Sequence, residues 1–398
     1  MAASATVAAG LLLNYTTLFG VGDEPDSLPD EDYAGVSSLL PTDTVDYSQM
    51  DYPRELKYKP AWEMVVKTFF YILSIILALV GNIIVIVVVA KNARMHTATN
   101  FYIVNLAVAD CLVVLTCSWT HLVDDLTPFW VLGSFFCTFN TFSQVLSLVA
   151  SISTLAVIAG DRFFGIVFAM KAHFVERRAR CTIALIWVFS LVVASPLLFF
   201  RRYQELQWRN MVEGWCDDVW PVEVWLDEET GKLMAYSPLR RLYYMTVCIV
   251  LFFIPCLIMT ITYAVIIVTV WSAKVPGERI SKDIKSQIRL RKRIIKMLVV
   301  IQAVFVLCWL PLIISLIYAE FVHQRDAMLH DWYIHFSYFA CYLAYANSAI
   351  NPFIYAGFNA NFMKGFASLC GGAEARSRYN TMVSRVDSFQ SSTHMTKV

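Results

Sequence analysis

The chain has 398 residues, of which 58% are hydrophobic and 16% are charged, and its formal net charge is +1. Soluble domains carry about 45–50% apolar residues and about 25% charged ones, so this composition is typical of an integral membrane protein. A net charge this close to zero gives no indication of nucleic-acid binding. The ten cysteines include no paired CxxC and no Cys/His cluster at metal-ligand spacing, which argues against a zinc or haem site.

Residues 1–61 are interpreted as an extracellular N-terminal tail. The second half of this tail is acidic and contains several prolines, a composition that favours disorder. Asn14 opens a glycosylation sequon (Asn-Tyr-Thr), which is usable only if the tail lies outside the cell. Met1–Leu13 lacks a positively charged start and is a poor match to a signal peptide.

Seven long apolar runs follow, and each is long enough to cross the ~30 Å hydrocarbon core of a membrane as a helix. They lie near 62–91, 98–126, 134–167, 178–199, 236–272, 286–319 and 331–356, within a membrane domain of residues 62–357. Residues 358–370 are amphipathic and are predicted to form a short helix on the membrane surface, with Cys370 as a candidate palmitoylation site. Residues 371–398 are rich in Ser and Thr and are predicted to form a mobile cytoplasmic tail.

Charge alternates between the connections that join these runs. The connections after the first, third and fifth runs are basic, and those after the second, fourth and sixth are acidic. Basic connections stay on the cytoplasmic side of a membrane. The sequence therefore predicts a multi-pass plasma-membrane protein with its N-terminus outside and its C-terminus inside.

Two cysteines fall in outer positions under this orientation. Cys137 begins the third apolar run, and Cys216 lies in the long acidic connection after the fourth run. Both would face an oxidising compartment, where disulfides persist. The other cysteines lie mostly inside apolar runs, so a bridge between Cys137 and Cys216 is predicted.

Asp110 lies midway through the second apolar run, at membrane depth. A carboxylate at this depth needs polar partners inside a helix bundle. The candidate partners are Asn82, Ser151, Asn347 and Asn351. Oxygen ligands suit hard cations, so this group is a candidate sodium site, with water completing the coordination.

Other intramembrane features indicate a switch. Asp161 and Arg162 follow about 20 apolar residues, which places these charges at a membrane boundary. Prolines that permit kinks recur at Pro196, Pro255, Pro311 and Pro352. Trp309 lies just before Pro311 and is interpreted as a side chain with two packing positions beside a hinge.

These residues together resemble a rhodopsin-like (class A) G-protein-coupled receptor over about residues 62–370. The resemblance rests on Gly81-Asn82, Asn105 to Asp110, Cys137 with Cys216, Asp161-Arg162-Phe163, Trp187, Pro255 with Tyr263, Cys308-Trp309-Leu310-Pro311, and Asn351-Pro352 with Tyr355. It implies an all-α membrane protein, a seven-transmembrane helix bundle with a short amphipathic eighth helix and a β-hairpin in the second extracellular loop. It also implies that the protein is not an enzyme.

The same resemblance implies a signalling role for the third helix. Arg162 would pair with Asp161 at rest and meet a heterotrimeric G protein after the sixth helix swings outward. Tyr263 and Tyr355 would then stack against Arg162. Phe163 stands where the family usually has tyrosine, a change that removes one hydroxyl and should be tolerated.

Two residues that other members of this family need for their ligands are absent here, which excludes some classes of ligand. The seventh run contains no lysine that could form a Schiff base, which excludes retinal. Amine receptors place an aspartate on the third helix where this chain has Gln144, so a small amine would lack its counter-ion. Residues 137, 144 and 151 are spaced by two helical turns, so they should face one side of the third helix.

Gln144, with Tyr345 and a long acidic loop rich in tryptophan, resembles peptide receptors of the orexin and RFamide (neuropeptide FF-like) group. In that group a glutamine at this place binds the amidated end of the peptide. Residues Tyr203–Trp208 and Val219–Trp225 alternate as the two strands of a hairpin would. The loop acids, among them Glu213, Asp217 and Asp218, would attract a basic peptide. The further pocket candidates are Thr120, His121, Asp124, Thr141, Tyr243, Ile313, Leu316 and Cys341.

The sequence therefore predicts a receptor that binds an extracellular neuropeptide, basic or amidated, and activates a G protein. Leu316 and Cys341 depart from residues expected in parts of the orexin and RFamide group, and invertebrate trissin or allatotropin receptors are alternatives within the class. Arrestin and a receptor kinase would act at the Ser/Thr-rich tail. A non-peptide ligand is an alternative, and so is a transporter, which would carry ionisable residues in several helices, whereas Asp110 is nearly alone.

Overall fold

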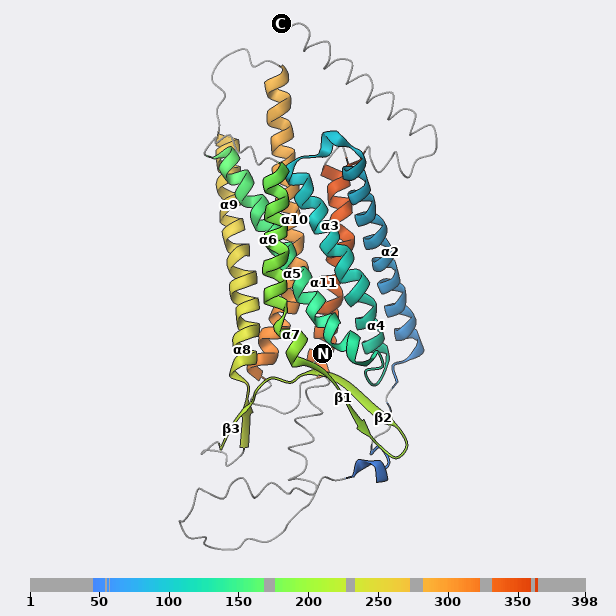
Figure 1. Cartoon of the computed structure of the whole chain (residues 1–398). Helices are drawn as coiled ribbons and strands as arrows, with labels where there is room; N and C mark the ends of the chain where they lie inside the picture. Colours follow the sequence, from blue (N-terminus) through green and yellow to red (C-terminus); the bar gives the residue numbers. More distant parts are fainter. Residues whose placement is uncertain are drawn as a thin grey trace.

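The computed structural model describes residues 46–53, 56, 58–167, 176–226, 233–272, 282–322, 331–358 and 362–363. Long helices lie side by side along one axis, and the strands gather at one end of the bundle (Figure 1). The end that carries the strands is called the disulfide end below, and the opposite end is called the Arg162 end. Asn14, Cys370, the C-terminal tail and most of the predicted eighth helix lie outside the described residues.

The helical bounds follow the predicted apolar runs closely. They are α2 (Ala61–Lys91), α3 (Ala98–Val113), α4 (Trp119–Leu126), α5 (Gly133–Ile166), α6 (Glu176–Ala194), α7 (Pro196–Phe200), α8 (Pro238–Met245), α9 (Ile254–Ser272), α10 (Lys282–Val322) and α11 (Asp331–Phe358). Short 3₁₀ turns are η2 (Tyr47–Gln49) and η3 (Ala93–Met95). The largest difference is at α10, which begins four residues earlier than predicted and so takes in the end of the basic segment.

Two of the predicted runs contain a wider π-helical segment. One is η4 (Val114–Ser118), between α3 and α4, and the other is η5 (Thr246–Phe253), between α8 and α9. Pro255 lies just after η5, and proline has no N–H for a regular helical hydrogen bond. A π-helical turn next to a proline lets the helix continue although this hydrogen bond is missing.

Six helical segments in the described part of the chain are long and apolar enough to cross a membrane. They are Ala61–Lys91, Ala98–Leu126, Gly133–Ile166, Arg178–Phe200, Pro238–Ser272 and Arg291–Phe321. The seventh predicted span forms α11, whose 28 residues are sufficient in length. Its sequence mixes Asn347, Ser348, Asn351 and several tyrosines with apolar residues, and most of these polar groups turn inward.

In the described part of the chain, four strands make two antiparallel pairs. β1 (Arg201–Gln207) pairs with β2 (Val212–Asp218), and β3 (Glu223–Leu226) pairs with β4 (Leu233–Tyr236). The first strand was predicted correctly from the sequence, but the prediction of Val219–Trp225 as its partner was wrong. The actual partner is β2, which contains Cys216, because a four-residue turn joins β1 and β2 directly.

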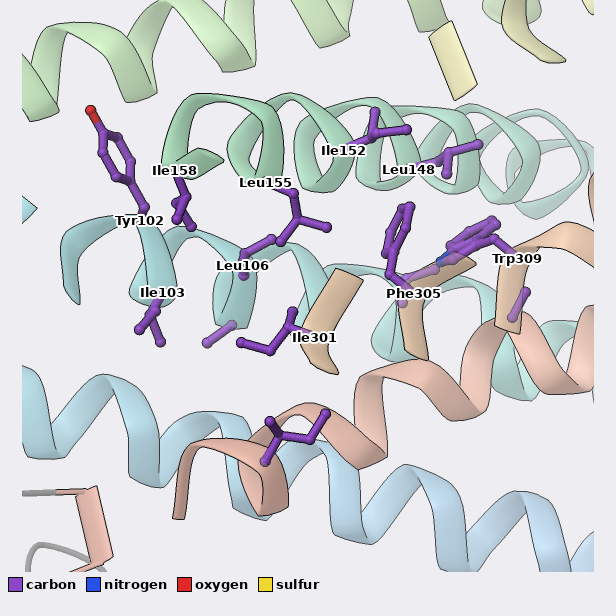
Figure 2. Close-up of a cluster of buried hydrophobic side chains, with 14 of the residues drawn as sticks. Tyr102, Ile103, Leu106, Leu148, Ile152, Leu155, Ile158, Ile301, Phe305 and Trp309 are labelled. Carbon is purple, nitrogen blue, oxygen red and sulfur yellow. The ribbon is translucent and has the colours of Figure 1, made fainter. Parts of the chain in front are cut away.

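The core at the middle of the bundle lies between α5 and α10. Leu148, Ile152 and Leu155 of α5 approach Ile301, Phe305 and Trp309 of α10, and all six are buried (Figure 2). Within each helix these residues recur every three or four positions, which places them on one face. The rings of Phe305 and Trp309 lie 6.0 Å apart between centroids.

Buried polar contacts connect neighbouring helices inside this core. Asn105 of α3 donates to Thr154 of α5 at 2.8 Å and accepts from the indole N–H of Trp187 of α6 at 2.8 Å. A buried amide with partners on two other helices fixes their relative positions, because an unpaired polar group in this setting is costly.

Gly81 permits a close approach of α2 and α11. A Cβ atom at this position of α2 would lie 2.7 Å from the ring of Pro352 on α11. Only glycine fits at that distance, so the two motifs of the first and seventh runs meet directly. This contact positions α11, which supplies residues to both polar sites described next.

Candidate functional site

A cavity of about 340 Å³ opens at the disulfide end of the bundle. α4, α11 and β2 supply most of its wall, through His121, Asp124, Asp125, Glu213, Gly214, Trp215, Ile334, Ser337, Tyr338 and Cys341. The rest of the wall comes from the segment 127–130 and from Tyr52 and Lys59, both of which precede α2 in the chain. Its size lies at the lower end of the range for small-molecule and cofactor pockets.

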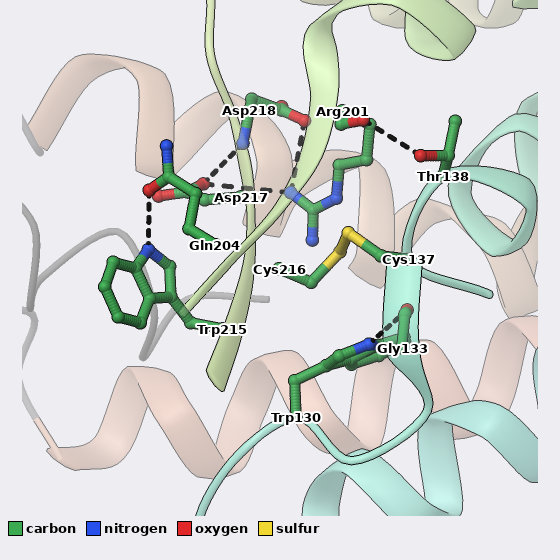
Figure 3. Close-up of a disulfide and its surroundings, with 10 residues drawn as sticks. All are labelled: Trp130, Gly133, Cys137, Thr138, Arg201, Gln204, Trp215, Cys216, Asp217 and Asp218. Atoms are coloured by element: carbon green, nitrogen blue, oxygen red, sulfur yellow. Dashed lines mark hydrogen bonds and ion pairs between the residues drawn. A yellow bond between two sulfur atoms is a disulfide. The ribbon is translucent and has the colours of Figure 1, made fainter. Parts of the chain in front are cut away.

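The disulfide predicted between Cys137 of α5 and Cys216 of β2 is confirmed, with the sulfurs 2.01 Å apart (Figure 3). It attaches β2 to the N-terminal part of α5 beside the cavity. Trp215, the neighbour of Cys216, donates its indole N–H to Gln204 across the strand pair at 2.9 Å. The bridge and this cross-strand contact together keep the cavity-lining part of β2 in place.

Gly214 brings β2 against the segment that precedes α5. Its carbonyl accepts from the backbone N–H of Trp130 at 2.9 Å. A Cβ atom on Gly214 would lie 2.8 Å from the hydroxyl of Tyr203 and 2.9 Å from the carbonyl oxygen of Trp130. A side chain at this position would therefore separate β2 from the cavity wall.

An aromatic layer lies next to the cavity around His121 of α4. The His121 ring lies 5.2 Å from that of Tyr338 and 5.7 Å from that of Tyr345, both on α11. Tyr71 of α2 is hydrogen-bonded to Nδ1 of His121 at 3.0 Å. Tyr345 does not itself line the cavity but lies behind His121, so a change there reaches the cavity through one ring contact.

The cavity wall contains several charged side chains. Asp125 forms ion pairs with Lys59 and, at 2.8 Å, with Lys67, which also contacts Glu63 at 2.7 Å. This group of two acids and two lysines is neutral overall. Asp124 and Glu213 add two further carboxylates to the wall.

Asp217 and Asp218, which were predicted from the sequence to attract the ligand, do not line the cavity. Arg201, opposite Asp218 in the strand pair, approaches Asp218 at 3.1 Å and Asp217 at 3.7 Å (Figure 3). Burial raises the pKa of the Asp217 carboxyl, and the positive charge of Arg201 opposes that rise. Tyr244 of α8 also donates to Asp218, so these acids have partners within the protein.

A second polar cluster surrounds Asp110, deep in the bundle. Ser348 and Asn351 of α11 donate to the two carboxylate oxygens at 2.8 Å each. Asn82 of α2 donates to the carbonyl of Ser348 at 2.9 Å. Asn347 and Ser151 are buried as predicted, but within the described part of the chain the hydrogen bonds to Asp110 come from Ser348 and Asn351. Sequence reasoning missed Ser348.

The Arg162 end holds the remaining charged motif. Arg162 pairs with Asp161 at 2.8 Å and donates to the hydroxyl of Thr99 on α3. Tyr263 of α9 and Tyr355 of α11 are buried at 4% and 0% exposure. The structure thus brings Asp161 and Arg162 together, as expected for a resting pair, while both tyrosines lie inside the bundle.

Most of the other predicted pocket residues lie outside this cavity. His121, Asp124 and Cys341 line it, whereas Thr120, Thr141, Gln144, Tyr243, Ile313 and Leu316 do not. Cys137, Gln144 and Ser151 are all buried, as expected for one inward side of α5. The sequence analysis missed Tyr52, Lys59, Ser337 and Tyr338, although the last two share a helix face with Cys341.

The fold and these sites define a multi-pass membrane receptor: a helix bundle with a disulfide-anchored cavity at one end and a partly buried Asp161–Arg162 pair at the other. A family model for 7 transmembrane receptors (rhodopsin family) matches residues 81–355. The chain belongs to this family, whose members are receptors and not enzymes.

Several relatives are similar over most of this chain. The tachykinin-like peptides receptor 99D of Drosophila melanogaster is 31% identical over 314 residues, which cover 77% of this chain and 57% of that receptor. Neuropeptide FF receptor 2 of Mus musculus is 30% identical, covering 74% of this chain and 70% of the mouse receptor. Neuropeptide receptor 22 of Caenorhabditis elegans is 33% identical, covering 77% and 69%.

Proposed function

We propose that this chain is a plasma-membrane receptor for an extracellular neuropeptide and that it activates a heterotrimeric G protein. The observation that carries the proposal is the cavity beside the Cys137–Cys216 bridge, lined by acids and aromatic rings. A disulfide persists in an oxidising compartment, so the disulfide end lies outside the cell and the Arg162 end inside. The similar receptors of fly, mouse and worm are named for peptides, which supports the same ligand class here.

The chemistry of the cavity favours a basic peptide. Asp124 and Glu213 add negative charge to the wall, and Trp130, Trp215 and Tyr338 add aromatic faces. A lysine or arginine side chain gains from both, through charge attraction and through contact with the rings. The β1–β2 hairpin would be the second extracellular loop, which presents Glu213 and Trp215 to the peptide. An amidated peptide end bound at Gln144 remains our prediction from the sequence.

Signalling would pass along α5 and α10 to the inner end. Trp309 lies two residues before Pro311, which permits a kink. Its ring packs on that of Phe305, one turn closer to the Arg162 end of α10. A peptide that favours a second packing of Trp309 would swing the inner half of α10 outward. Arg162 would then leave Asp161 for the G protein, with Tyr263, Tyr355, Asn351 and Pro352 adjusting around it. Arrestin and a receptor kinase would act later at the Ser/Thr-rich tail.

We also propose that the Asp110 cluster binds a sodium ion. The side-chain oxygens of Asn82, Asn347 and Asn351 are buried and have no hydrogen-bond partner in the described part of the chain. Buried oxygens of this kind near a carboxylate fit a hard cation. Asp110, Ser151, Asn347 and Asn351 are the residues that would hold the ion.

The proposal is tested by screening the full-length receptor in cells against synthetic peptides that vary in C-terminal amidation and in basic residues. A second-messenger response to basic peptides is expected. Glu213→Gln should lower their potency about tenfold, in line with about 1–3 kcal/mol for a buried charged contact. Glu205→Gln is the matched control, because Glu205 lies exposed on β1 of the same hairpin.

Two results would contradict this assignment. A response confined to non-peptide compounds would leave the receptor class intact but reject the peptide. Equal loss of potency in the Glu213 and Glu205 variants would show that the charge of the loop as a whole, and not the cavity, attracts the ligand.

A further inference from the structure

A segment that precedes α2 in the chain lies across the turn that joins β1 and β2. Residues Asp46–Pro53, called the N-terminal strap below, were assigned by composition to the disordered tail, but they contact this turn at several points. The carbonyl of Met50 accepts from the backbone N–H of Arg209 at 2.9 Å. The backbone N–H of Tyr52 donates to the side chain of Asn210 at 3.0 Å. These backbone contacts run from the strap to the hairpin turn.

Aromatic rings give the strap a more extensive contact. Tyr47 and Tyr52 approach Trp208 edge-on, with ring centroids 5.2 Å and 5.5 Å away. Tyr52 also approaches Phe129, in the segment between α4 and α5, at 5.6 Å. The strap therefore connects the hairpin turn with the segment 127–130, which lines the cavity. Edge-on ring pairs of this kind add attraction beyond the apolar area that they bury.

The strap forms part of the cavity wall. Tyr52 lines the cavity directly. Trp208, on which the strap packs, donates its indole N–H to Glu213 at 2.9 Å, and Glu213 is another lining residue. A displacement of the strap would therefore change one wall of the cavity and release the side chain that orients an acid in it.

An exposed ion pair closes this arrangement. Arg209 donates from its Nε to Asp51 at 2.8 Å and pairs with it again through a second nitrogen, a two-point contact. The hydrogen bonds from Arg209 lower the pKa of the Asp51 carboxyl. The side chains of Asp51 and Arg209 are 52% and 62% exposed, respectively. Exposed ion pairs are weak and are screened by salt. Such a contact opens far more easily than the helix core.

We propose that the N-terminal strap is a gate over the cavity and that the Asp51–Arg209 pair is its latch. The closed strap covers the cavity rim between Trp208 and Phe129, and opening it admits a ligand. The role as a ligand gate rests on the proposed function of the cavity, whereas opening and closing are properties of the chain alone. The latch sets how often the cavity is accessible.

Cys341, a free cysteine that lines the cavity and is 2% exposed, reports directly on access. The probe is 2-(trimethylammonium)ethyl methanethiosulfonate, whose positive charge suits the acidic wall. It is added to purified full-length receptor, and mass spectrometry follows the rate at which Cys341 is modified. Cys341→Ser defines the background. No peptide ligand is needed, so the result does not depend on identifying one.

Arg209→Glu and Asp51→Arg should each speed modification of Cys341 about two- to fivefold, the range expected from a weak exposed pair. The double variant Asp51→Arg with Arg209→Glu restores the pair in reverse and should return the rate towards that of the wild type. Arg202→Glu is the matched control, because Arg202 is an exposed arginine of β1 away from the strap. High salt should speed the wild type more than the single variants.

Equal rates in all of these forms would overturn the gate, and so would a double variant as fast as the single ones. If burial makes Cys341 unreactive in every form, the series is repeated with Ser337→Cys in the Cys341→Ser background, since Ser337 also lines the cavity. Equal rates in that series would equally reject the proposal. A restored double variant in a receptor that answers no peptide would uphold the gate and reject the peptide.

Discussion

Asp110 shows how one residue depends on neighbours far away in the sequence. Its two oxygens accept from Ser348 and Asn351, which are 238 and 241 positions further along the chain. The sequence indicated a polar cluster because a lone carboxylate at membrane depth needs partners. It selected Asn347 in place of Ser348, because only the rotation of α11 about its axis decides which of two adjacent side chains faces the acid.

Asp110→Asn should abolish the stabilisation of the receptor by sodium. The expected wild-type behaviour is a higher unfolding midpoint in NaCl than in KCl, because an ion that binds only the folded state stabilises it by mass action. The neutral amide removes the charge that attracts the ion. The measurement is thermal unfolding of purified receptor in the two salts, with Glu205→Gln as control. Equal midpoints of the wild type in both salts would argue against a sodium site.

At the scale of elements, close contacts between segments position the cavity. α11 contributes four lining residues, and its place beside α2 depends on the contact of Gly81 with Pro352. β2 reaches the cavity because Gly214 fits against Trp130 and because Cys216 is bridged to α5. A short residue at each crossing lets two backbones approach, and longer side chains around it fill the remaining space.

Gly81→Ala should destabilise the folded receptor by about 1–3 kcal/mol, the usual effect of forcing an extra carbon into a packed contact. Its Cβ would lie 2.7 Å from a ring that is fixed to the backbone of α11 and yields little. Gly160→Ala is the matched helical control, since a Cβ there meets nothing within 4 Å. Thermal unfolding of both purified variants compares the effects, and a Gly81→Ala receptor as stable as Gly160→Ala would contradict the packing argument.

At the scale of the whole molecule, α5 connects the two ends. Its 34 residues span about 51 Å, and the disulfide at Cys137 and the ion pair at Arg162 lie near its two ends. Between them its inward side contacts α3, α6 and α10 through buried side chains. A rigid helix in contact with most of its neighbours is a suitable fixed element against which α10 could move.

Arg162→Ala should remove second-messenger signalling and leave ligand binding in place. Arg162 lies at the end opposite to the cavity, so the variant loses the group that would meet the G protein without changing the cavity wall. Signalling and surface expression are measured in the same cells. Arg178→Ala, at an exposed arginine of α6, is the control. A normal response from Arg162→Ala at normal surface level would reject the proposed switch.

The sequence by itself determined the class of the protein, the helical spans and the disulfide. Apolar runs of membrane length, a charged pair at a boundary and two outer cysteines are local features, and each restricts the chain without reference to distant segments. The spans differ from the predicted ranges by only a few residues. The same local logic found Asp110 and the Asp161–Arg162 pair.

Only the tertiary structure decided which side chains line the cavity. Tyr52, Lys59, Glu213 and Tyr338 come from four separate segments, and their meeting depends on the rotation of each helix and on the partner chosen by β1. It likewise turned Asp217 and Asp218 towards Arg201 and brought the N-terminal strap onto Trp208. Contacts of this kind arise from packing between distant segments, which composition and periodicity do not encode.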